Sequence, residues 1–183
     1  MLIQSCNIEN HSNYSTFYIF SLLFLILFLK EILIMHVSSA KLQRIVDVPK
    51  DYFWKRLVAF KDVGSLLPPP IIDKVECDSN DIGSLRQLTL GEKQRFPGKV
   101  IERLESKYKD SFFVYSIVDQ SCLPVRNYIA TVSLDAISNN QTDICLSSNW
   151  IDHGAEQGEM KLMFESLYEL MFSNAEKQYQ KEV

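Results

Sequence analysis

Glu102 is the residue of this sequence best suited to acid–base chemistry. A carboxyl group inside an apolar cavity has a raised pKa and can exchange protons near neutrality. Three roles for this residue stay open on the sequence alone. Glu102 could be a catalytic acid or base, a passive polar anchor in a pocket, or the partner of Arg103 or Arg86 in an ion pair.

Other polar side chains could assist a carboxyl group but do not complete a catalytic set. Tyr115, Tyr128 and Arg126 could orient a carbonyl or carboxylate, although Arg126 follows Pro124-Val125 and fits a surface position at the mouth of a loop. Two of the three histidines, His11 and His36, lie outside residues 37–183, so a His-centred triad is hard to build, and no two of the four cysteines have Cys-x-x-Cys spacing. We therefore predict no metal site and no cofactor, with the cysteines as reduced, small hydrophobic side chains.

Two alternating segments between residues 111 and 134 must form strands that position these groups. SFFVYSIV is apolar and aromatic, and RNYIATVSL alternates between apolar and polar residues. A period of two places alternate side chains on opposite faces of a sheet. One face then carries Tyr128, Ala130, Val132 and Leu134, and a second set on the preceding strand is Phe113, Tyr115 and Ile117.

The rest of residues 37–183 predicts further strands and a long helix. We expect strands at 37–48, 71–76, 85–90, 100–105 and 143–151, and short helices at 50–60 and 63–67, the first beginning after Pro49. From about residue 156 the apolar residues recur every three or four positions, as in a long amphipathic helix. They are Met160, Met163, Phe164, Leu167, Tyr168, Met171 and Ala175. This order indicates an α+β fold in which a curved seven-stranded antiparallel sheet surrounds the helix and leaves a cavity.

Several motifs in this order resemble the START-like helix-grip superfamily, also called SRPBCC, and in particular its polyketide cyclase/dehydrase branch. They are SAKLQRIVDVPKDYFWKRL, GSLRQLTL, IERLE and YSIVDQSCLPVRNYIATVSL, within residues 38–178. The resemblance implies a pocket for a hydrophobic or amphipathic small molecule, lipid or polyketide-like, between the sheet and the C-terminal helix. The plant hormone receptors of this superfamily carry gate and latch sequences that GEKQRF and SCLPV do not match, so hormone reception is not supported.

The resemblance and the alternation together give a set of candidate pocket residues. They are Glu102, Phe113, Tyr115, Ile117, Tyr128, Ala130, Val132, Phe164, Leu167 and Met171. Two alternatives to simple binding stay open, because this fold hosts many activities. One is a cyclase- or dehydratase-type enzyme, a lyase or hydrolase that uses the pocket carboxylate, and the other is a protein-interaction module gated by its ligand.

Residues 1–36 are a hydrophobic N-terminal segment of a different kind. Residues 17–35 reach the length of a membrane span but enclose Lys30 and Glu31. Three interpretations stay open. The segment could be a membrane anchor with the domain in the cytoplasm, or a signal peptide. It could also be untranslated sequence upstream of the true start at Met35, in which case the protein is cytoplasmic. The net charge of −4 and the absence of a basic block exclude nucleic acid as the expected partner.

Overall fold

The computed structural model describes residues 20–24, 37–58, 60–118 and 121–183. The chain divides into two units, Met1–His36 and Val37–Val183. In the first unit, the described residues 20–24 are helical. Most of the segment 17–35, considered above as a membrane anchor, therefore lies outside the described residues. In the described part of the chain, no helix has both the length and the apolar character needed to cross a membrane.

The second unit is built on one antiparallel sheet of seven strands, in the spatial order β1-β7-β6-β5-β4-β3-β2. Each strand from β2 to β7 lies beside the next in sequence, and β1 closes the series by pairing with β7. The strands are β1 (Val37–Val46), β2 (Ile72–Cys77), β3 (Leu85–Leu90), β4 (Gly98–Tyr108), β5 (Phe112–Ile117), β6 (Val125–Ser138) and β7 (Gln141–Asp152).

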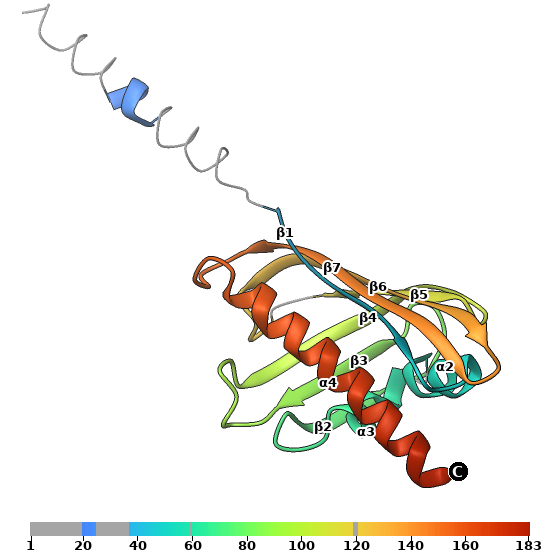
Figure 1. Cartoon of the computed structure of the whole chain (residues 1–183). Helices are drawn as coiled ribbons and strands as arrows, with labels where there is room; N and C mark the ends of the chain where they lie inside the picture. Colours follow the sequence, from blue (N-terminus) through green and yellow to red (C-terminus); the bar gives the residue numbers. More distant parts are fainter. Residues whose placement is uncertain (1–19, 25–36, 59, 119–120) are drawn as a thin grey trace, which may run out of the picture. The chain divides into compact units, whose positions relative to one another are not determined.

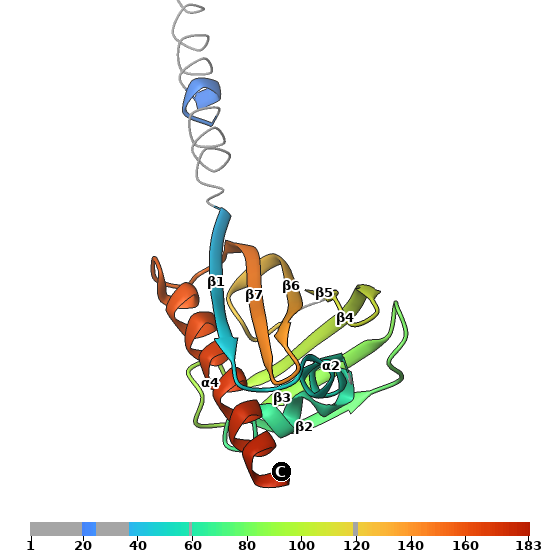
Figure 2. The same ribbon diagram turned by 45° about the vertical axis from the view of Figure 1, so that its right-hand side comes forward.

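The helices lie on one side of this sheet. The long helix α4 (Glu159–Glu182) crosses the concave face of the sheet diagonally (Figure 1). The short helices α2 (Lys50–Val58) and α3 (Val63–Leu66) lie near one end of the sheet (Figure 1 and Figure 2). A sheet with one apolar face must cover that face, and these helices do so. The predicted helix-grip fold, with two short helices after the first strand, is confirmed.

The alternation in the sequence fixes which side chains face α4. In β6, Tyr128, Ala130, Val132 and Leu134 are all buried, whereas the residues between them are more exposed. In α4, the predicted stripe faces the sheet, with Met160, Phe164, Tyr168, Met171 and Ala175 buried. One apolar face from each element therefore forms the core, and the burial of these side chains is the main favourable contribution to folding.

Polar contacts fix the position of α4 along β1. Arg44 of β1 donates to Glu176 of α4 across 2.6 Å and lies 3.4 Å from Glu169. At the same end, the rings of Phe53 and Phe172 meet edge to face with their centroids 6.3 Å apart. Both aromatic side chains are fully buried, so α2 and α4 are joined through the core.

One element differs from its sequence prediction in a way that matters for the site. The first helix was expected to continue to Phe60, but α2 ends at Val58 and Phe60 begins a 3-10 turn, η1 (Phe60–Asp62). In this turn the carbonyl oxygen of Phe60 accepts a hydrogen bond from Arg86 Nη1 of β3 at 2.9 Å.

Candidate functional site

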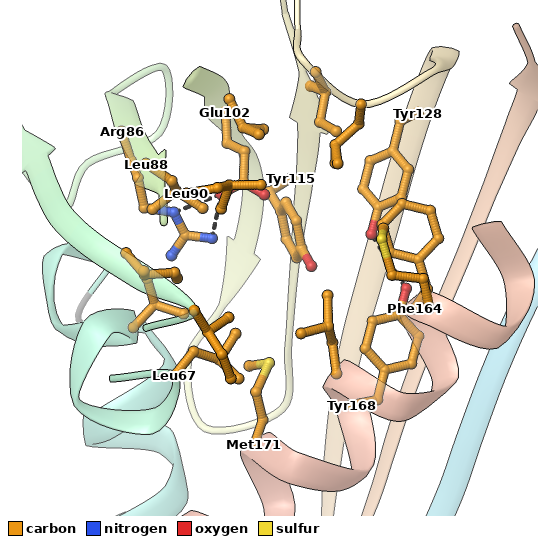
Figure 3. Close-up of a pocket in the computed structure, with 18 of the residues that line it drawn as sticks. Leu67, Arg86, Leu88, Leu90, Glu102, Tyr115, Tyr128, Phe164, Tyr168 and Met171 are labelled. Atoms are coloured by element: carbon orange, nitrogen blue, oxygen red, sulfur yellow. Dashed lines mark hydrogen bonds and ion pairs between the residues drawn. The ribbon is translucent and has the colours of Figure 1, made fainter. Parts of the chain in front are cut away.

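A cavity of about 150 Å³ lies between the concave face of the sheet and α4 (Figure 3). Its walls are mainly apolar side chains from α3, β3 to β6 and α4. The α4 side chains that line it follow the helical spacing of three and four residues: Met163, Phe164, Leu167, Tyr168 and Met171.

The most polar part of the wall is an ion pair between Arg86 of β3 and Glu102 of β4. The two residues are direct cross-strand partners. Arg86 Nε donates to Glu102 Oε2 at 2.6 Å, and Arg86 Nη2 lies 2.5 Å from the same oxygen. The side chains are 5% and 9% exposed, so the pair is shielded from bulk water. Attraction between opposite charges and hydrogen bonding offset the cost of removing both ions from water.

Other groups around Arg86 also stabilise its positive charge. Nη1 donates to the Phe60 carbonyl oxygen at 2.9 Å. The guanidinium carbon lies 3.9 Å from the centroid of the Phe60 ring and 5.5 Å from that of Tyr115. Because cations are attracted to aromatic faces, these two rings stabilise the guanidinium where water does not reach it.

A chain of hydroxyl groups lies on the opposite side of the cavity. The hydroxyl oxygens of Tyr128 and Tyr168 are 3.2 Å apart, and those of Tyr168 and Ser148 are 2.6 Å apart. All three residues are buried. Figure 3 shows the Tyr128 and Tyr168 hydroxyls turned toward each other, with the Tyr115 ring between them and the ion pair.

Burial keeps these tyrosines protonated. Burial raises the pKa of Tyr168 to about 12, and the hydrogen bond between Tyr168 and Ser148 partly opposes this rise. Burial also raises the pKa of Tyr115 and of Tyr128 well above the ordinary value, and the nearby Glu102 carboxylate adds to the effect at Tyr115. The cavity therefore presents neutral phenol groups, which can both donate and accept hydrogen bonds.

The loop between β3 and β4 borders the cavity through Gln94, Arg95 and Phe96. Arg95 Nε donates to Glu159 Oε1 at 2.9 Å, which ties the loop to the first turn of α4. Gln94 Nε2 donates to the Pro70 carbonyl oxygen at 2.8 Å. Because the Arg95 side chain is 70% exposed, the cavity approaches solvent at this loop.

The structure brings nearly all of the predicted pocket residues to this cavity. The residues that line it are Glu102, Phe113, Tyr115, Ile117, Tyr128, Val132, Phe164, Leu167 and Met171. Ala130 is buried on the same face of β6, where it pairs with Tyr115, but it does not line the cavity. Arg126 is exposed, with Nη2 2.9 Å from His153 Nε2, and takes no part in the site.

For Glu102, the structure combines two of the roles that the sequence left open. The carboxylate lines the cavity and also pairs with Arg86, the cross-strand partner considered above. Arg103, the other partner considered, instead pairs with Glu105 at 2.8 Å. Glu102 is therefore a paired carboxylate in the wall of the cavity.

Sequence reasoning missed two groups that shape the site. From the sequence, Arg86 is predicted only as a possible ion-pair partner. Arg86 nevertheless shares one face of its strand with the apolar residues Leu88 and Leu90, and this alternation indicates that its side chain points toward the cavity. Tyr168 was assigned to the helix stripe as a packing residue, yet its hydroxyl joins two strands. Among the described residues, no group of three His, Cys, Asp or Glu side chains could hold a metal ion.

No protein-family model and no curated protein matches this chain. Solved structures do match it. The protein XoxI from Bacillus cereus superposes with a TM-score of 0.65 at 17% identity, covering 78% of this chain and 96% of its own. Truncated norcoclaurine synthase from Thalictrum flavum gives a TM-score of 0.65 at 15% identity, covering 78% of this chain and 93% of its own.

A second structure of that synthase was determined in complex with dopamine and hydroxybenzaldehyde. It has a TM-score of 0.65 at 14% identity, and the match covers 82% of this chain and 91% of the synthase. At identities this low, the superpositions establish the fold alone. Together with the strand order and the position of α4, they show that this chain has the helix-grip fold that these solved structures share.

Proposed function

We propose that this protein binds a small amphipathic molecule in the cavity between the sheet and α4. The observation that carries the proposal is an apolar cavity with polar groups on two opposite sides, the Arg86–Glu102 pair and the Tyr128–Tyr168 hydroxyls. Ligand sites are typically apolar pockets in which a few polar groups fix the orientation of the ligand.

The size of the cavity limits the ligand. An apolar cavity of about 150 Å³ in another protein binds benzene, whereas drug-sized ligands occupy pockets of about 300–1,000 Å³. This cavity also measures about 150 Å³. A molecule with one ring and a short substituent fits this volume, and a polycyclic polyketide or a long acyl chain would require the walls to move. The norcoclaurine synthase structure with dopamine and hydroxybenzaldehyde, both one-ring compounds, supports the same size class.

Glu102 serves as a polar anchor under this proposal. Two guanidinium nitrogens contact its Oε2 atom, and the strand pairing holds both side chains in place. The carboxylate is thereby committed to Arg86 and is not left free beside a reacting group. Binding without turnover is therefore the function that this geometry favours.

Native mass spectrometry of the purified full chain tests the proposal. We expect a bound small molecule, or stoichiometric uptake of added benzyl alcohol. Leu167→Trp should abolish uptake by filling the cavity that Leu167 lines. Leu162→Trp is the matched control, because Leu162 lies on the same helix but is 69% exposed. Equal uptake by both variants, or no uptake by the native chain, would contradict the proposal.

A further inference from the structure

We propose that the Arg86–Glu102 pair makes this cavity selective for uncharged, hydroxyl-bearing one-ring molecules over carboxylates and amines of the same size. This inference rests on the ligand binding proposed above and specifies its chemistry. It follows from the charges that face the cavity, from the hydrogen bonds that those charges already make, and from the polar atoms that remain available.

The charges inside the cavity cancel. Among the described residues that line it, the charged ones are Arg86, Glu102 and Arg95. Arg95 lies at the solvent-facing loop and is paired with Glu159, which leaves the Arg86–Glu102 pair as the inner charges. The titratable groups facing this pair from β5, β6 and α4 are the hydroxyls of Tyr115, Tyr128 and Tyr168, which are protonated at neutral pH. An ionic ligand would therefore add an uncompensated charge.

Three of the five N–H groups of the Arg86 guanidinium are already engaged, and its positive charge is balanced by Glu102. Nε and Nη2 are directed to Glu102, Nη1 is directed to the Phe60 carbonyl oxygen, and the rings of Phe60 and Tyr115 lie against it. A carboxylate ligand would either meet the remaining N–H groups beside the negative Glu102 carboxylate, which repels it, or displace Glu102 from these contacts. Displacement would leave the Glu102 carboxylate buried without its cation, which costs free energy that the new pair only replaces.

For a ligand with a neutral hydroxyl group, hydrogen-bonding atoms of the cavity wall remain available. Both contacts from Arg86 end on Glu102 Oε2, and no hydrogen bond from a described residue reaches Oε1. Oε1 can therefore accept a proton donated by a ligand hydroxyl. On the opposite side, Ser148, Tyr168 and Tyr128 supply three O–H groups but make two hydrogen bonds among themselves. The Tyr115 hydroxyl also interacts with that of Tyr128. At least one O–H proton of these groups is left over, so the cavity end of the chain, at Tyr128 and Tyr115, can donate to a ligand oxygen or accept from it.

Three probes of one size test this selectivity at neutral pH: benzyl alcohol, benzoate and benzylammonium. Isothermal titration of the full chain should give a dissociation constant at least about tenfold lower for benzyl alcohol than for either ion, because an unpaired ion in an apolar site costs several kcal/mol. Loss of the benzyl alcohol signal in Leu167→Trp would locate this binding in the cavity.

Two charge variants test whether the pair is the cause. Glu102→Gln leaves Arg86 positive and should bind benzoate more tightly than the native chain does, and Arg86→Met leaves Glu102 negative and should favour benzylammonium. Glu105→Gln is the control, because Glu105 lies on the same strand but does not line the cavity. Circular dichroism checks that each variant is folded, and if the charge variants do not fold, the comparison of probes on the native chain decides.

The outcomes separate this inference from the proposed function. Native binding of benzoate or benzylammonium as tight as that of benzyl alcohol would overturn the selectivity but leave ligand binding intact. Folded charge variants with unchanged preferences would also overturn it. If none of the three probes binds, the proposed function fails, and the selectivity fails with it.

Discussion

Arg86 and Glu102 face each other across β3 and β4 with their charged groups 2.6 Å apart, inside the cavity between the sheet and α4. The pair projects from the sheet's concave surface into a site shielded from bulk water, where the loss of hydration must be offset by attraction and hydrogen bonds. Phe60 makes this match through both its carbonyl oxygen and its ring. The turn η1, which begins at Phe60, therefore contributes to the construction of the site.

Removing one partner of this pair should destabilise the domain strongly. Arg86→Met leaves the Glu102 carboxylate buried and unpaired, so we expect the free energy of unfolding in urea to fall by about 3–5 kcal/mol. The double variant Arg86→Met/Glu102→Leu should recover most of this loss, because it leaves no buried charge. Arg103→Met is the control at a more exposed pair, with an expected change of about 0–1 kcal/mol. Equal losses in the single and double variants would show that the pair is not electrostatically coupled.

The hydroxyl of Tyr168 should contribute measurably to stability. Tyr168→Phe removes the hydrogen-bond partner of Ser148 and Tyr128 while keeping the ring in place. A buried hydroxyl left without a partner costs about 1–3 kcal/mol, which thermal or urea unfolding can measure. The same change at Tyr108, which is 67% exposed, should have no comparable effect. Equal stabilities of the two variants would contradict the hydroxyl chain.

The pKa of the buried tyrosines predicts the response to alkaline pH. The pKa of Tyr168 is raised from 10.0 to about 12, mainly by burial, and those of Tyr115 and Tyr128 are raised in the same direction. The unfolded chain loses these protons near its lower pKa, so their contribution to stability is full below that pKa. Stability should decline as the pH rises from about 10 toward 12 and beyond.

Ultraviolet titration of tyrosinate measures this effect directly. The folded protein should show one group of tyrosines that ionises near the ordinary pKa and a second group that ionises only at higher pH or on unfolding. Tyr168→Phe should remove one member of the second group. Ionisation of every tyrosine near the ordinary pKa in the folded protein would show that these phenols are not buried.

Gly91 should tolerate no side chain. A Cβ atom at this position would lie 2.2 Å from the carbonyl oxygen of Pro70, a backbone atom that cannot rotate away. Gly91→Ala should therefore cost about 1–3 kcal/mol in unfolding experiments and weaken probe binding by shifting the loop that carries Gln94 and Arg95. Gly64→Ala is a milder control, because its Cβ would lie 3.1 Å from a methyl group of Val75. Equal stabilities of the two variants would contradict this account.

The sequence predicts the architecture because period-two and helical patterns report directly which face of an element is buried. Tyr128, Ala130 and Val132 follow from the alternation of β6, and the stripe that includes Phe164 and Met171 follows from the spacing in α4. These two faces must meet, so the sequence predicts much of the cavity lining that β5, β6 and α4 supply, but not the lining from α3, β2 and β3.

The chemistry of the site could not be predicted in the same way. Whether Glu102 is free or paired depends on the register of β3 against β4, which places Arg86 directly opposite it. The donor role of Arg86 toward Phe60 depends on where α2 ends, and helix ends are poorly defined by sequence patterns. The volume left between sheet and helix depends on the packing of every lining side chain.

A crystal structure of the full chain with 4-bromobenzyl alcohol would test the central claim most directly, because bromine can be located by its anomalous scattering. The account predicts one bromine site inside the cavity, with the alcohol oxygen within hydrogen-bond distance of Glu102 Oε1 or the Tyr128 hydroxyl. A cavity filled with water or side chains, with bromine absent or bound only at the molecular surface, would contradict it.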